Sequence, residues 1–144
     1  MLELGAGTGL PGIVAATVGA RVVQTDRHEL ALDLCRRNGA RNGARPISYR
    51  LADWTSWRDD DLYDVILGSD ILYADRLHAD VRRILERNLV TGGRVLLSDP
   101  FRSASLRLLQ SMEDDGWSVS MAKWNVAGAA DPRAIGVFEL AAPN

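Results

Sequence analysis

The most informative segment of this 144-residue chain reads Leu2-Glu-Leu-Gly-Ala-Gly-Thr-Gly-Leu-Pro-Gly12. Its apolar start, Met1 to Leu4, predicts a strand, and the small apolar residues from Leu10 to Val18 predict a helix packed closely on a sheet. Glycines between the two let the backbone adopt positive φ and let a ligand approach without Cβ atoms in the way. Ligands in open α/β sheets bind beyond the carboxyl ends of the strands, so we expect the binding site at this glycine loop.

Short β-rich runs alternate with helical periods along the rest of the chain, which is typical of an α/β fold with a largely parallel sheet. The expected further strands are 21–25, 47–51, 63–68, 94–98, 117–124 and 134–140, and the expected further helices are 28–38, 75–89 and 103–115. Because no helix separates the last two strands, they should pair antiparallel as a hairpin. No linker interrupts the pattern, so residues 1–144 are expected to form a single domain.

Two of these helices carry specific expectations. The apolar face of helix 28–38 should hold Leu30, Ala31, Leu34 and Cys35. Gly39 should end that helix, and Asp75 should be the N-cap of the amphipathic helix 75–89. Cys35 is the only cysteine, so no internal disulfide can form, and we expect it to pack in the core.

Charge and hydropathy exclude several classes of protein. The chain carries 17 basic and 19 acidic residues, and a formal charge of -2 argues against a nucleic-acid scaffold held by bulk electrostatics. No apolar run approaches the ~20 residues that cross a bilayer. The acidic start Met1-Leu-Glu-Leu4 does not resemble a signal peptide. We expect a cytoplasmic protein without membrane or nucleic-acid partners, and the isolated His28 and His78 do not indicate a metal site.

The glycine loop by itself leaves two ligand classes open. Gly7-Thr-Gly-Leu-Pro-Gly12 satisfies the dinucleotide pattern G-x-G-x-x-G, but it starts three residues after Leu4, late for a tight strand-to-helix turn. Glu3 just before the loop would repel a pyrophosphate and favour a cationic ligand, unless it is only a solvated strand end. S-adenosylmethionine carries a sulfonium and an ammonium group and no phosphate, so it fits this acid better than NAD does.

Acids after the second and third expected strands extend the site. Asp26 follows Gly7 by 19 residues, a distance at which an acid accepts hydrogen bonds from ribose hydroxyls. Asp53 is placed to accept from an adenine amino group while the indole of Trp54 covers the ring face. The alternatives are a turn or cap role for Asp26 and a core or loop-packing role for Trp54.

At this point several motifs resemble the class I, seven-strand, S-adenosylmethionine-dependent methyltransferases. The resemblance rests on Leu2 to Gly12, Thr25-Asp26, Ala52-Asp-Trp54 and Gly68-Ser-Asp-Ile-Leu-Tyr73. More narrowly, these residues resemble the lysine methyltransferase branch with an Asp-x-x-Tyr motif after the fourth strand, which includes bacterial proteins often labelled predicted nicotinamide N-methylases. Asp99-Pro-Phe-Arg102 is similar to the Asp-Pro-x-Arg segment in relatives of the electron-transfer flavoprotein β-subunit lysine methyltransferase.

The resemblance implies a doubly wound, Rossmann-like sheet of order 3-2-1-4-5-7-6 and a role for each motif residue. The implied cofactor residues, besides Glu3, are Gly5, Gly7 and Gly9 for the methionine part, Asp26 for the ribose, Asp53 and Trp54 for the adenine, and Ser69 beside both rings. Asp70 and Tyr73 would be catalytic and face the acceptor amine, unless Asp70 caps a turn and Tyr73 only packs. Asp99 and Arg102 would shape the substrate side, although an Asp-Pro turn explains them equally well.

The family usually carries a segment before the glycine loop, whereas this chain begins inside the first expected strand. We therefore expect an N-terminally truncated core that exposes apolar surface and binds cofactor weakly, with a homodimer as one way to cover that surface. The resulting functional prediction is an N-methyltransferase acting on a protein lysine. A small-molecule amine methyltransferase, a non-catalytic cofactor-binding module and an NAD-dependent oxidoreductase remain as alternatives.

Overall fold

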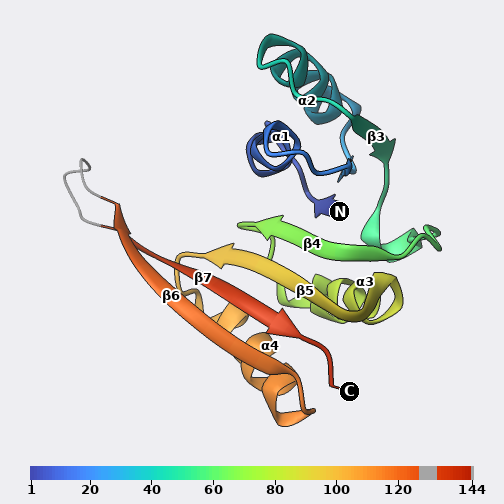
Figure 1. The fold of residues 1–144 in the computed structure, drawn as a ribbon. Helices are drawn as coiled ribbons and strands as arrows, with labels where there is room; N and C mark the ends of the chain where they lie inside the picture. Colours follow the sequence, from blue (N-terminus) through green and yellow to red (C-terminus); the bar gives the residue numbers. More distant parts are fainter. Residues whose placement is uncertain (127–132, 144) are drawn as a thin grey trace.

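All seven strands form one sheet in the computed structural model, which describes residues 1–126 and 133–143. The strand order is β3-β2-β1-β4-β5-β7-β6, which confirms the order implied by the resemblance (Figure 1). The strands are β1 (Leu2–Leu4), β2 (Val22–Asp26), β3 (Ile47–Leu51), β4 (Tyr63–Ser69), β5 (Leu89–Asp99), β6 (Ser118–Val126) and β7 (Arg133–Ala141). The α-helices are α1 (Leu10–Thr17), α2 (Glu29–Arg41), α3 (His78–Asn88) and α4 (Ser103–Asp114), with 3₁₀ turns η1 (Trp54–Ser56) and η2 (Asp75–Leu77).

The sheet is parallel from β3 to β5, and β7 then lies antiparallel between β5 and β6. The expected terminal hairpin is therefore confirmed. In the register of β1, Leu2 is level with Val23 of β2 on one side and with Ile66 of β4 on the other. The winding direction changes between β1 and β4, which is where such sheets bind their ligands.

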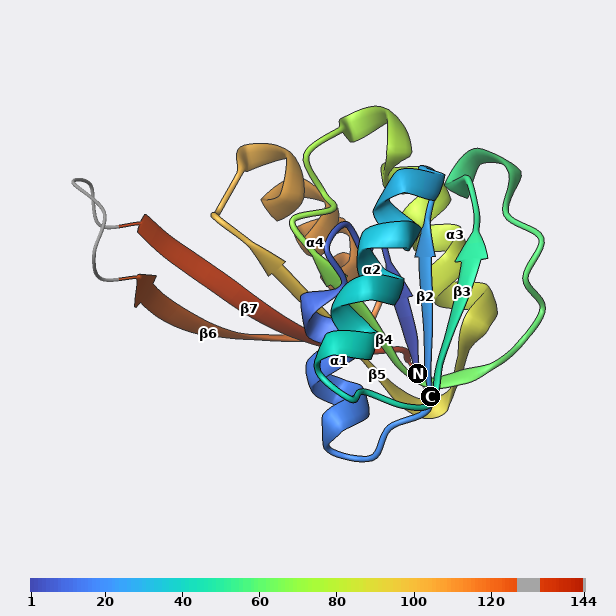
Figure 2. The same cartoon turned by 90° about the horizontal axis from the view of Figure 1, so that it is seen from above.

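The helices form two layers, with α1 and α2 on one face of the sheet and α3 and α4 on the other (Figures 1 and 2). The larger core lies between the sheet and α3 and α4, where Leu2, Leu4 and Ile66 are fully buried. A smaller core, formed by Ile13, Ala16, Val22 and Ala44, lies under α1. In the described residues no helix is long and apolar enough to cross a membrane.

Helix α2 differs from expectation in its end and in its buried face. It continues to Arg41, and Gly39 is a buried residue inside it. A Cβ at Gly39 would lie 2.8 Å from Oη of Tyr49, so this position has no room for a side chain. Leu32, Cys35 and Gly39 face the sheet, at positions i, i+3 and i+7. Burial of Cys35 is confirmed, but Leu30 and Leu34 are 80% and 47% exposed, so the predicted apolar face was wrong for these two.

The region around α3 also differs from the prediction. Asp75 does not cap α3; it begins η2, and its carboxylate pairs with Arg107 at 3.0 Å. The strand β5 starts directly at Leu89, and its pairing with β4 shifts between Leu89 and Arg94. Gly92 and Gly93 thus lie in a bulge within the strand rather than in a turn before it.

Helix α1 presents an apolar face to solvent. Leu10, Val14 and Val18, spaced four residues apart along the helix and its C-cap, are 64%, 54% and 81% exposed.

Candidate functional site

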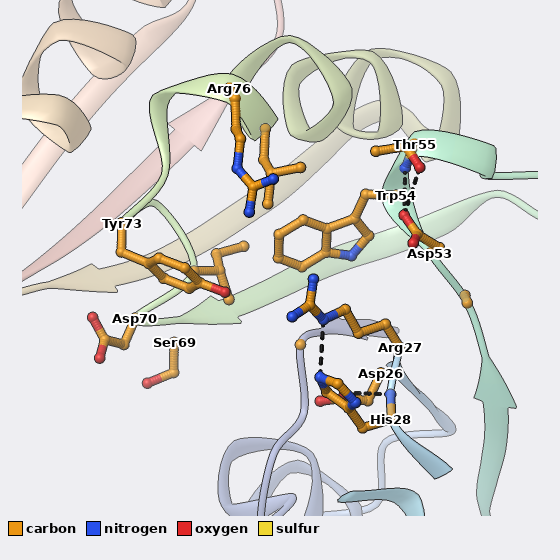
Figure 3. Close-up of a pocket in the computed structure, with 14 residues that line it drawn as sticks. Asp26, Arg27, His28, Asp53, Trp54, Thr55, Ser69, Asp70, Tyr73 and Arg76 are labelled. Carbon is orange, nitrogen blue, oxygen red and sulfur yellow. Dashed lines mark hydrogen bonds between the residues drawn. The ribbon is translucent and has the colours of Figure 1, made fainter.

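A cavity of about 290 Å³ lies beyond the carboxyl ends of β1 to β4 (Figure 3). Its lining consists of Gly5, Asp26, Arg27, His28, Ala52, Asp53, Trp54, Thr55, Ser69, Asp70, Ile71, Tyr73, Arg76 and Leu77. The sheet brings these residues together because the ends of parallel strands meet at one edge. In Figure 3, Ser69, Asp70 and Tyr73 lie at one end, Asp53 and Thr55 at the other, and the Trp54 indole between them.

The glycine loop borders the cavity through Gly5, and its glycines have different roles. Gly5, Gly7 and Gly9 have φ angles of 62°, 57° and 81°, in the left-handed region. A Cβ at Gly5 would lie 3.0 Å from Ile71 and 3.3 Å from Trp54, so a side chain there would intrude between two cavity residues. A Cβ at Gly7 would come no closer than 4.0 Å to any atom beyond its chain neighbours, so there is open space beside this exposed residue, whose amide is bound to Asp26.

Gly9 does not line the cavity. It is buried, and a Cβ there would lie 2.8 Å from Nε2 of Gln24 and 3.0 Å from Sγ of Cys35. Gly12 is packed as tightly, because a Cβ there would overlap the Glu3 carboxylate. Because these two glycines have no side chain, the loop and the start of α1 can pack directly against Glu3 of β1 and Gln24 of β2.

Glu3 lies beneath the loop and not on the cavity. It is 1% exposed, and its Oε2 accepts from the Gly12 amide at 3.1 Å and from Nε2 of Gln24, its neighbour in register on β2, at 2.6 Å. The alternative of a solvated strand end is therefore wrong. Burial raises the pKa of the Glu3 carboxyl to about 7, even though both hydrogen bonds favour the charged form.

Asp26 lies on the cavity and also organises the backbone. Its Oδ2 accepts from the Gly7 amide at 3.0 Å, and its Oδ1 accepts from the His28 amide at 2.9 Å. The alternative of a turn role is thus seen in the structure, in the same carboxylate that faces the cavity. Beyond it, the Arg27 side chain donates to Nε2 of His28 at 2.9 Å.

Asp53 and Trp54 follow β3 and line the cavity, Asp53 at its end and the Trp54 indole in its middle (Figure 3). Oδ1 of Asp53 accepts from both the amide and the hydroxyl of Thr55, and these bonds hold the Asp53 pKa below its usual range. Trp54 is half-buried, with its indole against Gly5 and its carbonyl accepting from Arg83 at 2.9 Å. The indole thus belongs to the cavity wall while it also packs against the larger core.

Asp70 and Tyr73 follow β4 at the opposite end. Asp70 has φ of 58°, and its amide donates to the Ser98 carbonyl of the neighbouring strand at 2.8 Å, which fixes the turn. Its carboxylate pairs with the guanidinium of Arg102. Tyr73 is 56% exposed at the cavity mouth, which argues against a mere packing role.

Seven of the residues expected from the sequence line the cavity: Gly5, Asp26, Asp53, Trp54, Ser69, Asp70 and Tyr73. Glu3, Gly7 and Gly9 are not among the lining residues. Arg27, His28 and Arg76 line it without having been predicted. No motif marks these three residues. The only signals were that Arg27 and His28 directly follow Asp26 and that Arg76 comes three residues after Tyr73.

A sequence model of the lysine methyltransferase family matches residues 1–114. The chain is 43% identical over 86 residues to protein N-lysine methyltransferase METTL21A of Xenopus tropicalis, covering 56% of this chain and 40% of that protein. It is 30% identical over 134 residues to histone-arginine methyltransferase METTL23 of Xenopus laevis, covering 88% and 53%. The chain thus spans about half the length of the curated relatives it matches.

A solved structure extends the comparison to the fold. The precorrin-6y C5,15-methyltransferase of Geobacter metallireducens superposes with a TM-score of 0.80 over 99% of this chain and 78% of its own, at 18% identity. At this identity the likeness concerns the fold alone. It agrees with the seven-strand fold described above.

Proposed function

The chain belongs to the lysine methyltransferase family, and from this premise we propose that it is an S-adenosylmethionine-dependent N-methyltransferase acting on a protein lysine. The observation that carries the proposal is the placement of Asp70 and Tyr73. Both lie on the cavity that the glycine loop borders, after a strand adjacent to β1. A relative named as an arginine methyltransferase makes a protein arginine the second candidate.

The residues of the cavity fit S-adenosylmethionine. Gly7 leaves open space where a side chain would lie, and the half-exposed Asp26 retains lone pairs for ribose hydroxyls beyond its two backbone bonds. The Trp54 indole provides a flat apolar surface for an adenine ring. We assign the methionine part to Gly5 and Gly7, the ribose to Asp26 and the adenine to Asp53, Trp54 and Ser69.

When bound, S-adenosylmethionine supplies the methyl group: the lone pair of the acceptor nitrogen forms the new N–C bond while the S–C bond breaks and leaves its electron pair on a neutral thioether. The chain contributes geometry, since holding the reacting atoms about 3 Å apart supplies much of the rate enhancement. Asp70 accepts a hydrogen bond from the acceptor N–H and directs the lone pair, and Tyr73 closes the other side of the amine.

The protonation state of the acceptor sets a further requirement. A lysine amine has a pKa of about 10.4 and must reach the site neutral, because an ammonium has no lone pair to donate. After transfer the nitrogen carries the positive charge and loses its proton to solvent. The exposed positions of Asp70 and Tyr73 give that proton a short path to water.

The test is transfer of a labelled methyl group from S-adenosylmethionine into lysate proteins, followed by hydrolysis and amino-acid analysis. We expect label in methyl-lysine. Asp70→Asn should lower the transfer roughly 100-fold, because it removes the negative charge and puts an NH₂ donor in place of one acceptor oxygen, while affinity for S-adenosylhomocysteine stays within about twofold. Asp114→Asn is the matched control, an exposed acid on α4 whose partner is Gln110.

The outcomes separate the alternatives. Label in methyl-arginine, or only in small molecules, would exclude the lysine assignment. Binding of S-adenosylhomocysteine without any transfer would indicate a non-catalytic module. Thermal stabilisation by NAD but not by S-adenosylhomocysteine would indicate an oxidoreductase instead.

A further inference from the structure

We propose that Arg102 is a positioning residue that determines acceptor specificity, because it occupies one oxygen of Asp70 and leaves the other for an amine rather than a guanidinium. The inference rests on the proposed role of Asp70 as the acceptor-orienting residue. It concerns the choice between lysine and arginine, the two acceptors named for relatives of this chain.

Arg102 lies between two carboxylates. Its Nη1 contacts Oδ1 of Asp70 and also donates to Oδ2 of Asp99 at 3.0 Å. The two acids come from the ends of neighbouring strands, β4 and β5, so the guanidinium bridges the turn after each strand. Within the described part of the chain, Oδ2 of Asp70 has no hydrogen-bond partner.

Asp99 holds Arg102 through both its backbone amide and its guanidinium. Its side chain is fully buried, and it accepts from the Arg102 amide at 2.7 Å and from the Ser105 hydroxyl at 2.7 Å, in addition to the guanidinium. Ser105 also lies 3.2 Å from the Leu72 carbonyl, in the segment that follows Asp70. A buried carboxylate with several charge-assisted bonds holds its partner in one geometry.

The backbone is held in an unusual conformation at Asp70 and at Phe101, the residue before Arg102. Asp70 and Phe101 are the only non-glycine residues with positive φ in the described part, at 58° and 63°. The Phe101 ring packs edge-on against Phe138 of β7, with centroids 6.0 Å apart. Such conformations persist where the surroundings impose them, and they cluster at functional sites. The contact between Arg102 and Asp70 therefore belongs to a constrained part of the fold.

This arrangement discriminates between acceptors by geometry and by charge. A guanidinium binds a carboxylate best with two parallel N–H donors, one for each oxygen, whereas an amine needs a single oxygen. With Oδ1 of Asp70 engaged, only the single-oxygen contact remains. The positive charge of Arg102 also favours a neutral acceptor, and a neutral amine is far easier to obtain than a neutral guanidine, because a guanidinium holds its proton more tightly than an ammonium does.

The test compares two probes, Nα-acetyl-lysine methylamide and Nα-acetyl-arginine methylamide, titrated by NMR into the protein saturated with S-adenosylhomocysteine. The measured quantity is the ratio of the arginine-probe Kd to the lysine-probe Kd, because a change of net charge alters both affinities together. Arg102→Gln removes the charge and retains a polar group for Asp99, and Arg102→Met removes both. Arg94→Met, in the middle of β5, is the matched control, since it breaks a surface pair with Glu139.

We expect wild type to favour the lysine probe and both Arg102 variants to lower the Kd ratio at least roughly fivefold, because a second carboxylate oxygen becomes available. Arg94→Met should leave the ratio unchanged. An unchanged ratio in Arg102→Gln, or an equal change in the control, would overturn the inference even if wild type methylates lysine. Absence of methyl transfer by wild type would instead refute the proposed function.

Discussion

The backbone amide of Gly7 donates to Oδ2 of Asp26 at 3.0 Å, which ties the middle of the glycine loop to the end of β2. The other oxygen of the same carboxylate accepts from the amide of His28, the N-cap of α2. Asp26 is therefore connected to two chain segments that border the cavity. A change at this residue should alter the shape of the site as well as its chemistry.

Replacement of Asp26 by asparagine keeps one acceptor oxygen and places an NH₂ group against one of the two backbone donors. We expect a loss of about 1–2 kcal/mol in the free energy of unfolding and roughly tenfold weaker binding of S-adenosylhomocysteine. Urea unfolding and calorimetric titration measure the two effects. Asp33→Asn, a half-buried position on α2 whose carboxylate pairs with Arg36, is the control, and equal affinity of the Asp26 variant and wild type would contradict the assignment.

Two alanine substitutions in the glycine loop should separate binding from packing. Gly9→Ala should cost about 2–4 kcal/mol of stability, because the new Cβ meets Gln24 and Cys35 in addition to the left-handed φ. Gly7→Ala has open space around it, so it should cost only about 1–2 kcal/mol while weakening cofactor binding. Thermal unfolding with and without S-adenosylhomocysteine checks both. The reverse order of stabilities would show that the loop packs differently.

Trp54 should report cofactor binding through its fluorescence. The half-buried indole lies on the cavity, so S-adenosylhomocysteine should change its emission, and Trp54→Phe should abolish most of that change. Losing the larger ring surface should weaken binding roughly three- to tenfold. Trp124→Phe, at an exposed site on β6, is the control. A signal that survives in Trp54→Phe and disappears in Trp124→Phe would refute the adenine assignment.

The strands and the location of the cavity could be predicted from local patterns in the sequence, whereas the strand order was implied by the resemblance to the seven-strand methyltransferases. Apolar runs mark the strands, and the glycine loop after Leu4 identifies the edge of the sheet that binds ligands. The acids at Asp26 and Asp53 follow strand ends, so their place on the cavity required only the topology. Asp70 lies on the same cavity because β4, the strand before it, is adjacent to β1.

Other features depended on contacts that spacing does not reveal. The buried face of α2 is set by the fit of Gly39 against Tyr49, which leaves Leu30 in solvent although it is apolar. The inward orientation of Glu3 depends on Gln24, a partner 21 residues away that a strand register brings alongside. The contact of Arg102 with Asp70 spans 32 residues and two strand ends. Predicting each of these three features requires the side-chain positions of residues on separate elements.

Glu3 provides a pH-dependent prediction with a defined sign. Its pKa is about 7 in the folded chain, against an ordinary value of 4.5, because burial disfavours the carboxylate. Between these two values the folded state binds more protons than the unfolded state, so stability falls as pH rises through that window. The shift corresponds to about 3 kcal/mol, which the protein loses between pH 4.5 and pH 7.

Glu3→Gln should remove this dependence, because the amide stays neutral while its oxygen still accepts from Gly12 and Gln24. The free energy of unfolding of the variant minus that of wild type should rise by about 3 kcal/mol from pH 4.5 to pH 8, as urea unfolding at several pH values would measure. Glu113→Gln, an exposed acid on α4, should show no comparable rise. Parallel stability curves for Glu3→Gln and wild type would mean that Glu3 ionises like an exposed acid, and the buried arrangement under the glycine loop would be wrong.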